Sequence, residues 1–550
     1  MNDPTGTYAF AYDNMGRIIG TTTTYSFMPN IPFTNSYSYD ADSNRAGYTA
    51  PDGSTNTYSY DTLNRLTTLA NSWAGSFGLS YDSLSRRTQM TRPNGITTNY
   101  TYDSLSRLLS VLHQAGGSTI DGASYALDAA GNRTAKTDDL TGITSNYTYD
   151  KIYELTQVTQ GSDTKETYGY DPVGNRQSSL SVPSYTVNSS NELTSNSNAS
   201  YTYDDNGDTT SKTTSSGTTN YTWDFESRLA SVTLPGSGGT ATFKYDPFGR
   251  RIQKAVTQNG TTTTTDYLYN GDNEVETTDQ NGSVVAKFAQ GQSIDEPLAE
   301  SNSSGAYFYQ QDGLGSVTSI SNGAGQLAQT YTYSSFGDTI NSTGNVANPF
   351  RYTSRHFDSE TGLYYYRARY YDPTVGSFLS EDKFQFDAEH DFYVYVGNSV
   401  LNAIDPSGNT QQDVGTIVST ASSAVGLMTA VGLRFNAPGF ANNAIATATY
   451  VYDGLALQPD SGLPFKIPYL GCGQQSEFVV GQEIPLIPKL QDNWNLSELW
   501  RLTPFFHQYV AATDNNPKDP DVIIDPYNNQ YQLIPKGGNL NSNSWQPLYK

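Results

Sequence analysis

Residues 58–87 read YSYDTLNRLTTLANSWAGSFGLSYDSLSRR, and the Tyr-Asp pattern in this stretch decides the fold. Tyr39, Tyr60, Tyr81 and Tyr102 are each followed by Asp, and they lie 21 residues apart. Less regular copies include YDNMGR from residue 12, YDPVGNR from residue 170 and YDPFGRR from residue 245. A fixed period of this length indicates a repeat architecture in which each unit packs on its neighbours.

Each repeat is predicted to be a β-hairpin. Segments such as NTYSYD and TNYTYD alternate aromatic and small polar residues with period two, which is typical of strands. The Asp that follows, with Pro, Gly, Asn or Ser nearby, favours a turn. Because one hairpin is marginal in water, neighbouring hairpins must pair into a continuous sheet. The pattern therefore predicts a mainly β fold, and composition alone fits an open solenoid or a propeller equally well.

Composition restricts the functional classes. The 550 residues carry a formal net charge of −23, which argues against a nucleic-acid-binding surface. One Cys excludes an intrachain disulfide. The acidic stretch 204–208 is interpreted as a hydrogen-bonded turn, because it lacks the later Glu of a calcium loop. No cofactor or metal site is expected.

Two further segments bear on location. The N-terminal MNDPTGTYAF has no basic and apolar regions of a signal peptide, and the chain opens within a repeat. We therefore expect it to be part of a longer polypeptide. Residues 414–433 are uncharged but rich in Ser and Thr, which favours a buried or pore-entering helix over a stable membrane span.

Residues 301–409 carry five motifs in order: DGLGSV, YSSFGD, GLYYYRARYYDPTVGSFLSED, YVYVGN and DPSG. Together with the Tyr-Asp repeats, these motifs resemble the core of Rhs/YD-repeat proteins, bacterial shell proteins that enclose a C-terminal effector. The resemblance implies that the repeats of residues 1–300 wind into a spiral strip forming a hollow shell. It also implies that residues 301–409 close one end of that shell.

In many proteins of this family the core cuts the chain after a final DPxGL motif with an aspartyl-protease pair. The matching positions here are Asp382 and Asp405, with Arg367 and Arg369 positioning the segment and cleavage after Asn409. The sequence departs from the family twice: the residue after Asp382 is Lys rather than Pro, and Asn409 replaces Leu. The alternative is that both aspartates only hold turns.

The repeats stop at residue 410. Residues 410–465 suggest a helical linker region of small residues, and residues 466–550 a small α+β domain. In that domain the order Cys472, His507, Asp525 resembles papain-fold toxin domains. There His507 would deprotonate Cys472 and Asp525 would orient the imidazole. A peptidase, a deamidase and a transglutaminase-like enzyme remain open, and a lone Cys is commonly an inert core residue.

These observations predict a secreted or cell-surface shell whose cargo is its own C-terminal domain. The resemblance implies an immunity protein and a secretion-system component as partners. The alternative is a structural or adhesive cell-surface protein without catalytic activity. A third hypothesis is a self-processing protein whose only chemistry is the cut by Asp382 and Asp405.

Overall fold

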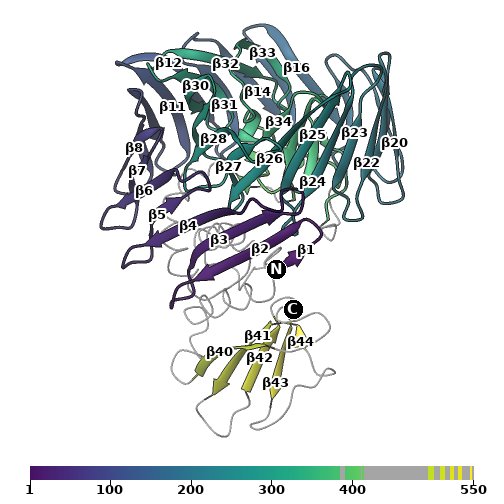
Figure 1. Cartoon of the computed structure of the whole chain (residues 1–550). Helices are drawn as coiled ribbons and strands as arrows, with labels where there is room; N and C mark the ends of the chain where they lie inside the picture. Colours follow the sequence, from purple (N-terminus) through teal and green to yellow (C-terminus); the bar gives the residue numbers. More distant parts are fainter. Residues whose placement is uncertain are drawn as a thin grey trace. The chain divides into compact units, whose positions relative to one another are not determined.

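The computed structural model describes residues 1–383 and 391–409, and the strands 412–413, 494–500, 508–514, 521–525, 530–534 and 546–547. The chain divides into two compact units, Met1–Pro438 and Gly439–Lys550. Among the residues that the structure describes, strands dominate in both units, with two 3-10 helices and no α-helix (Figure 1). None of these residues forms a helix able to span a membrane.

The first sheet of unit 1 is a 17-stranded antiparallel meander in which each strand pairs with the next. Its strands are β1 (Asn2–Asp3), β2 (Gly6–Tyr12), β3 (Ile18–Tyr25), β4 (Phe33–Tyr39), β5 (Arg45–Thr49), β6 (Thr55–Tyr60), β7 (Leu66–Asn71), β8 (Gly75–Tyr81), β9 (Arg87–Thr91), β10 (Ile96–Tyr102), β11 (Leu108–Ala115), β12 (Ser118–Leu127), β13 (Arg133–Asp138), β14 (Thr144–Tyr149), β15 (Leu155–Gln160), β16 (Asp163–Tyr170) and β17 (Arg176–Ser179).

The second sheet continues the pattern with 16 strands. These are β18 (Tyr185–Val187), β19 (Leu193–Asn196), β20 (Ala199–Tyr203), β21 (Thr209–Thr214), β22 (Gly217–Trp223), β23 (Leu229–Thr233), β24 (Thr240–Tyr245), β25 (Arg251–Gln258), β26 (Thr261–Asn270), β27 (Asn273–Thr278), β28 (Val284–Gln290), β29 (Pro297–Asn302), β30 (Gly305–Gln311), β31 (Val317–Asn322), β32 (Leu327–Tyr333) and β33 (Thr339–Gly344).

The second sheet lies against the first, so the strip winds back on itself. Strands β26 and β27 run beside β3–β5 (Figure 1), where the Tyr25 hydroxyl donates to the Tyr267 carbonyl at 2.9 Å. Further along, Asn94 donates to the Asn322 carbonyl at 2.9 Å. One apolar cluster joins Leu69 and Phe77 of the first sheet to residues of β27–β30. The predicted spiral of hairpins is confirmed.

Contacts made by the Tyr-Asp motif link each turn to the next repeat. Asp61 Oδ1 accepts from the backbone N–H of Arg65 at 3.0 Å, and Oδ2 accepts from the Arg65 Nε at 2.7 Å. The same guanidinium donates to the Asp82 carbonyl of the next repeat at 3.0 Å and lies 5.0 Å from the Tyr81 ring centroid. The Tyr81 hydroxyl donates back to the Leu66 carbonyl at 2.8 Å. A motif with this Asp and Arg therefore closes its own turn and also contacts the following hairpin.

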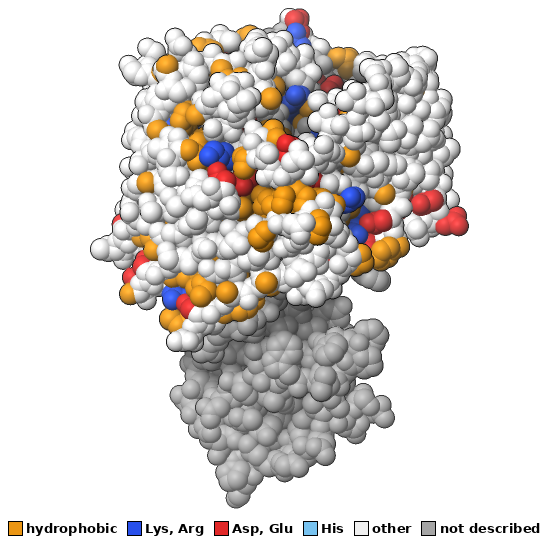
Figure 2. All heavy atoms as spheres, viewed as in Figure 1, with side chains coloured by type: hydrophobic (Ala, Val, Ile, Leu, Met, Phe, Trp, Pro, Cys, Tyr) orange, Lys and Arg blue, Asp and Glu red, His pale blue; other side chains and the backbone are white. Residues whose placement is uncertain are grey.

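Most of the visible surface is uncharged. Figure 2 shows Lys, Arg, Asp and Glu side chains, alone or in small groups, scattered over a mainly white surface with several apolar patches, one of them near the centre of the view. Several exposed apolar residues occupy one position of the repeat turn, two residues after the Asp. They include Leu63, Leu84 and Leu105, which are 63%, 62% and 70% exposed.

The core segment that follows β33 is compact and aromatic. It contains η1 (Tyr352–Ser354), η2 (Val396–Asn398) and a four-stranded antiparallel sheet, β34 (His356–Asp358), β35 (Leu363–Tyr366), β36 (Arg369–Asp372) and β37 (Ser377–Phe378). Strand β38 (Ala403–Ile404) pairs with β39 (Gln412–Asp413). A cluster of fully buried aromatic rings fills its centre and packs on strip residues such as Leu155.

Unit 2 contains a five-stranded antiparallel sheet in its described part. Its strands are β40 (Trp494–Trp500), β41 (Gln508–Asp514), β42 (Asp521–Asp525), β43 (Gln530–Ile534) and β44 (Gln546–Pro547). The helices expected within 410–465 lie outside the described residues.

Candidate functional site

The segment before the predicted cleavage position is bound by the Arg-Ala-Arg motif of residues 367–369, which leads from β35 into the first residue of β36. The Arg367 guanidinium donates to the Pro406 carbonyl. The Ala368 N–H donates to the next carbonyl, that of Ser407, at 3.1 Å. Two successive carbonyls are thus held by a side chain and a backbone donor from adjacent residues.

Arg369 continues this pattern and joins the two candidate aspartates. Its Nε donates to the Gly408 carbonyl. Its Nη2 lies 2.9 Å from Asp382 Oδ2 and 3.6 Å from Asp405 Oδ2. Burial lowers the pKa of Arg369, and the two carboxylates oppose this effect. The structure therefore brings both predicted aspartates to one buried guanidinium.

The two oxygens of Asp405 face different partners. Oδ1 accepts from the N–H of Gly408 at 2.9 Å and of Asn409 at 3.2 Å, and so closes the DPSG turn. Oδ2 faces Arg369. Asp405 is 3% exposed. A turn function and a chemical function are thus compatible in one carboxylate.

Strand pairing brackets the predicted cleavage position. Ala403 pairs with Asp413, and Ile404 pairs with Gln412. The peptide bond after Asn409 therefore belongs to the loop between β38 and β39. A cut there would separate β38 and β39 in the chain.

Gly408 makes the close approach possible. Its φ is +77°, and an added Cβ would lie 2.2 Å from the Tyr366 carbonyl oxygen and 3.1 Å from the Arg369 nitrogen. Only glycine combines this backbone conformation with so little space. The glycine of the DPSG motif is thus a requirement of docking as well as of the turn.

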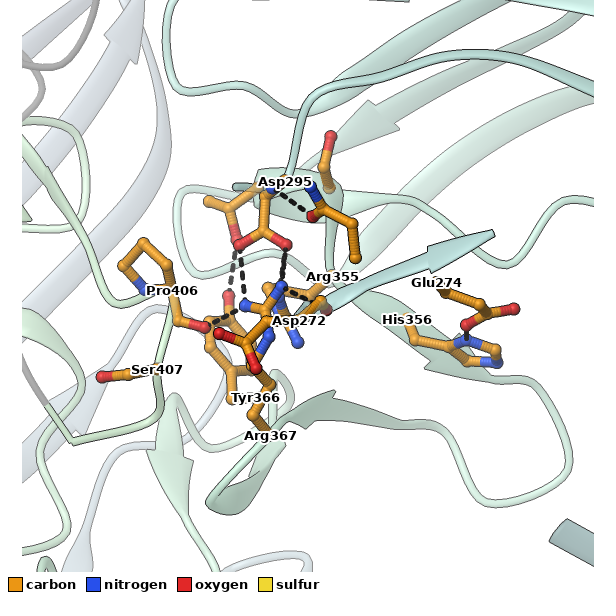
Figure 3. A network of polar contacts seen from close by, with 12 residues as sticks. Asp272, Glu274, Asp295, Arg355, His356, Tyr366, Arg367, Pro406 and Ser407 are labelled. Atoms are coloured by element: carbon orange, nitrogen blue, oxygen red, sulfur yellow. Dashed lines mark hydrogen bonds and ion pairs between the residues drawn. The ribbon is translucent and has the colours of Figure 1, made fainter. Parts of the chain in front are cut away.

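A further network reaches this segment from the strip (Figure 3). Asp295, in the loop between β28 and β29, binds Arg367 with both oxygens, at 2.7 and 3.0 Å. Asp295 Oδ1 also lies 2.6 Å from Arg355 Nη1. Burial opposes ionisation of Asp295, but the two guanidinium groups keep its pKa below the usual value. Nothing in the local sequence marked Asp295, because its partners are far along the chain.

The core segment is also anchored by a buried ion cluster. Asp358 of β34 is fully buried and lies 2.5 Å from Arg251 Nη1 and 2.8 Å from Lys254 Nζ, both on β25. Burial opposes ionisation, but these cations hold the pKa of Asp358 well below its usual range. This cluster ties the core sheet to the strip.

The predicted papain-like group is only partly covered by the structure. Cys472 and His507 lie outside the described residues. Asp525 is the last residue of β42, where its backbone pairs with Gln530 of β43. The grouping of these three residues stays a prediction.

Comparison with known proteins shows which families and solved structures this architecture is similar to. Residues 132–392 match the Teneurin YD-shell family, and residues 81–119 match the RHS repeat family. The crystal structure of TcdB2-TccC3-Cdc42 superposes with a TM-score of 0.64 over 76% of this chain and 24% of that one, at 19% identity. The β-rich region has the fold of a YD-repeat shell. A Photorhabdus luminescens Tc holotoxin pore shares the fold with the same TM-score of 0.64, at 18% identity over 74% of this chain and 24% of that one.

Curated relatives match part of this chain in sequence. A tRNA3(Ser)-specific nuclease WapA from Bacillus spizizenii is 35% identical over 46% of this chain and 11% of its own length. Double-stranded DNA deaminase toxin A from Burkholderia cenocepacia is 25% identical over 52% of this chain and 22% of its own length. Toxin protein Tse5 from Pseudomonas aeruginosa is 26% identical over 34% and 17%. The chain thus spans about a tenth to a fifth of the length of these relatives.

Proposed function

We propose that this chain is the shell and core of an Rhs-type toxin that carries a C-terminal effector and cuts itself after Asn409. The observation that supports this most directly is the buried Arg369, which contacts Asp382, Asp405 and the Gly408 carbonyl. Two carboxylates at one site next to a bound segment of the chain are the components of an aspartyl-protease centre.

The chemistry needs one ionised and one protonated carboxyl group. The ionised member of the pair removes a proton from a water molecule, whose oxygen attacks the carbonyl carbon of Asn409. The protonated member supplies a proton to the departing nitrogen of Thr410 as the C–N bond breaks. One proton is taken up and one released, so the pair ends with the same total charge. Arg369 contacts both members of the pair and holds the carbonyl one residue before the cut.

Substitution of Asp382 or Asp405 by asparagine distinguishes the proposed catalytic function of the carboxylates from a function in holding turns. In Asp405→Asn the side-chain oxygen can still accept the turn N–H groups, but no carboxylate remains. We expect Asp405→Asn and Asp382→Asn to leave the chain intact, while the wild type yields a fragment that begins at Thr410. Asp82→Asn is the matched control, because Asp82 closes a repeat turn in the same way, at 2.9 Å from the Arg86 N–H.

Mass spectrometry of the purified proteins identifies the fragments and the cut bond. Cleavage in both aspartate variants at the wild-type rate would contradict the proposal. So would a wild-type chain that stays intact after prolonged incubation.

We further propose that the segment after the cut is the effector, with Cys472 as nucleophile, His507 as base and Asp525 orienting the imidazole. The names of the relatives include a nuclease, a deaminase toxin and a toxin, which supports a toxic cargo but leaves its chemistry to be tested. Residues 410–550 expressed in bacteria should arrest growth, and Cys472→Ala should abolish the effect. His507→Ala should slow labelling of Cys472 by iodoacetamide. Toxicity that survives Cys472→Ala would contradict the cysteine assignment.

By the same reasoning we propose a secreted or cell-surface location, with delivery by a secretion system and an immunity protein in the producer. Co-expression of the neighbouring gene with residues 410–550 tests the immunity partner, which should restore growth.

A further inference from the structure

We infer that Asp295 of the shell is a positioning residue for the cut after Asn409, acting through Arg367. This inference rests on the proposed self-cleavage, but it concerns a residue of the strip rather than of the core segment. Asp295 lies between β28 and β29, and the loop brings it to the Arg-Ala-Arg motif (Figure 3).

The contacts form a chain from the strip to the segment that is cut. Asp295 binds Arg367 in a bidentate pair at 2.7 and 3.0 Å, which fixes the plane of the guanidinium. The same guanidinium donates to the Pro406 carbonyl, three residues before Asn409. The Asp272 carbonyl accepts from its other nitrogen at 3.3 Å. The Arg367 guanidinium is therefore held between Asp295, a strip carbonyl and the bound segment.

Burial and backbone geometry show that the arrangement is specific. The side chains of Arg367 and Asp295 are 14% and 11% exposed. Both residues have positive φ, +62° and +59°, which is uncommon for residues other than glycine and costs energy. An exposed ion pair contributes too little stability to offset this backbone strain at both partners.

Arg355 makes the carboxylate charge necessary. It lies 2.6 Å from Asp295 and is 5% exposed, and burial together with Arg367 lowers its pKa. Without the negative charge, two buried guanidinium groups would repel each other at this site. Arg367 would then move away from Pro406, and the bound segment would lose one of its three successive carbonyl contacts.

The primary test compares Asp295→Asn with Glu296→Gln in the full chain. Glu296 is the adjacent residue of the same loop and pairs with Arg87 of the strip, with both side chains 13% exposed. Displacement of a bound segment by about 1 Å slows a positioned reaction by about 10²-fold, and we expect this loss in Asp295→Asn. Glu296→Gln should cut at the wild-type rate. Equal losses in both variants would mean that the loop matters only for folding, and would overturn the inference.

A double-mutant cycle tests whether Asp295 acts through Arg367. If it does, Asp295→Asn combined with Arg367→Met should cut no more slowly than Arg367→Met alone. Losses that multiply would show independent roles and contradict the inference. Asp295→Glu keeps the charge and should recover part of the rate.

Hydrogen exchange provides a readout that does not depend on cutting. The Ala368 N–H, bonded to the Ser407 carbonyl, and the Gly408 N–H, bonded to Asp405, should exchange faster in Asp295→Asn than in Glu296→Gln. The measurement uses Asp382→Asn as the uncut background, or the wild type if it stays intact. Unchanged exchange overturns the positioning role even if the chain cuts, whereas an uncut wild type with altered exchange contradicts only the proposed self-cleavage.

Discussion

Replacing Gly408 by Ala should slow the cut after Asn409 and leave the rest of the fold unchanged. An added Cβ would lie 2.2 Å from the Tyr366 carbonyl oxygen, so the two must separate by about 1 Å to reach ordinary van der Waals contact. The Tyr366 carbonyl belongs to β35 inside the core sheet, whereas Gly408 lies in a turn after β38. The turn should therefore yield, and the segment should move away from the Arg-Ala-Arg motif.

The size of the effect follows from two separate terms. Alanine at φ +77° costs about 1 kcal/mol of backbone strain. The displacement of about 1 Å should slow cleavage by about 10²-fold, because positioned reactions lose rate steeply with misplacement. Gly16→Ala isolates the first term: Gly16 has φ +79°, and an added Cβ would meet nothing within 4 Å. We expect Gly16→Ala to cut at the wild-type rate.

The assay is a time course of cell-free synthesis with a labelled amino acid. After synthesis is stopped, loss of the full-length chain and appearance of the fragment from Thr410 are followed on denaturing gels. The Asp405→Asn chain serves as the gel marker for uncut protein. A Gly408→Ala chain that cuts as fast as Gly16→Ala would refute the reasoning, since it would show that close docking of this segment is not required.

Two further predictions concern stability of the shell. Asp358→Asn should destabilise unit 1 by about 3–5 kcal/mol, since it leaves Arg251 buried without its partner, and a shift in the urea midpoint measures this. Arg251 and Lys254 lower the pKa of Asp358 in the folded state, so the stability that its carboxylate contributes is complete above about pH 4 and is lost as the pH falls toward the folded pKa. A difference in unfolding free energy between wild type and Asp358→Asn that grows in acid would contradict this sign. Arg65→Gln should lower the free energy of unfolding by about 1–3 kcal/mol, because it removes the contacts of the guanidinium with the turn aspartate and with a carbonyl and a Tyr ring of the next hairpin. Lys165→Gln, which breaks an exposed ion pair, should change this free energy little. Equal midpoints for the last two variants would show that the repeat arginines do not stabilise the strip.

The strip could be predicted from sequence because its contacts are local. The YDTLNR turn closes within five residues, and its arginine reaches only the next hairpin, at Asp82. Period, hairpins and turn chemistry are therefore all visible in a window of about two repeats. The sequence alone did not reveal that Arg65 joins successive hairpins, although its regular place after each Asp was the available indication.

The candidate site was predictable only where a motif marked it. Asp382, Asp405 and Arg369 were found through the resemblance to the family core, and the structure brings them together. Asp295 could not be found in this way. Its partner Arg367 lies 72 residues further along, and no pattern in GQSIDEP distinguishes it from other loop aspartates. Long-range pairing of this kind depends on how the strip winds, which the sequence does not display.

The difference in sequence separation between these local and long-range contacts also sets the order in which parts of the chain fold. Arg65 contacts residues within about one repeat, but Arg367 and Arg369 each reach a carbonyl 39 residues ahead, and Arg367 reaches Asp295 72 residues behind. The bound segment therefore acquires its full set of contacts only after both the β28–β29 loop and the core sheet have formed. A chain synthesised from its N-terminus completes the strip before residue 409 emerges. If the cut requires these contacts, it follows assembly of the shell, and an unfinished shell does not release its C-terminal segment.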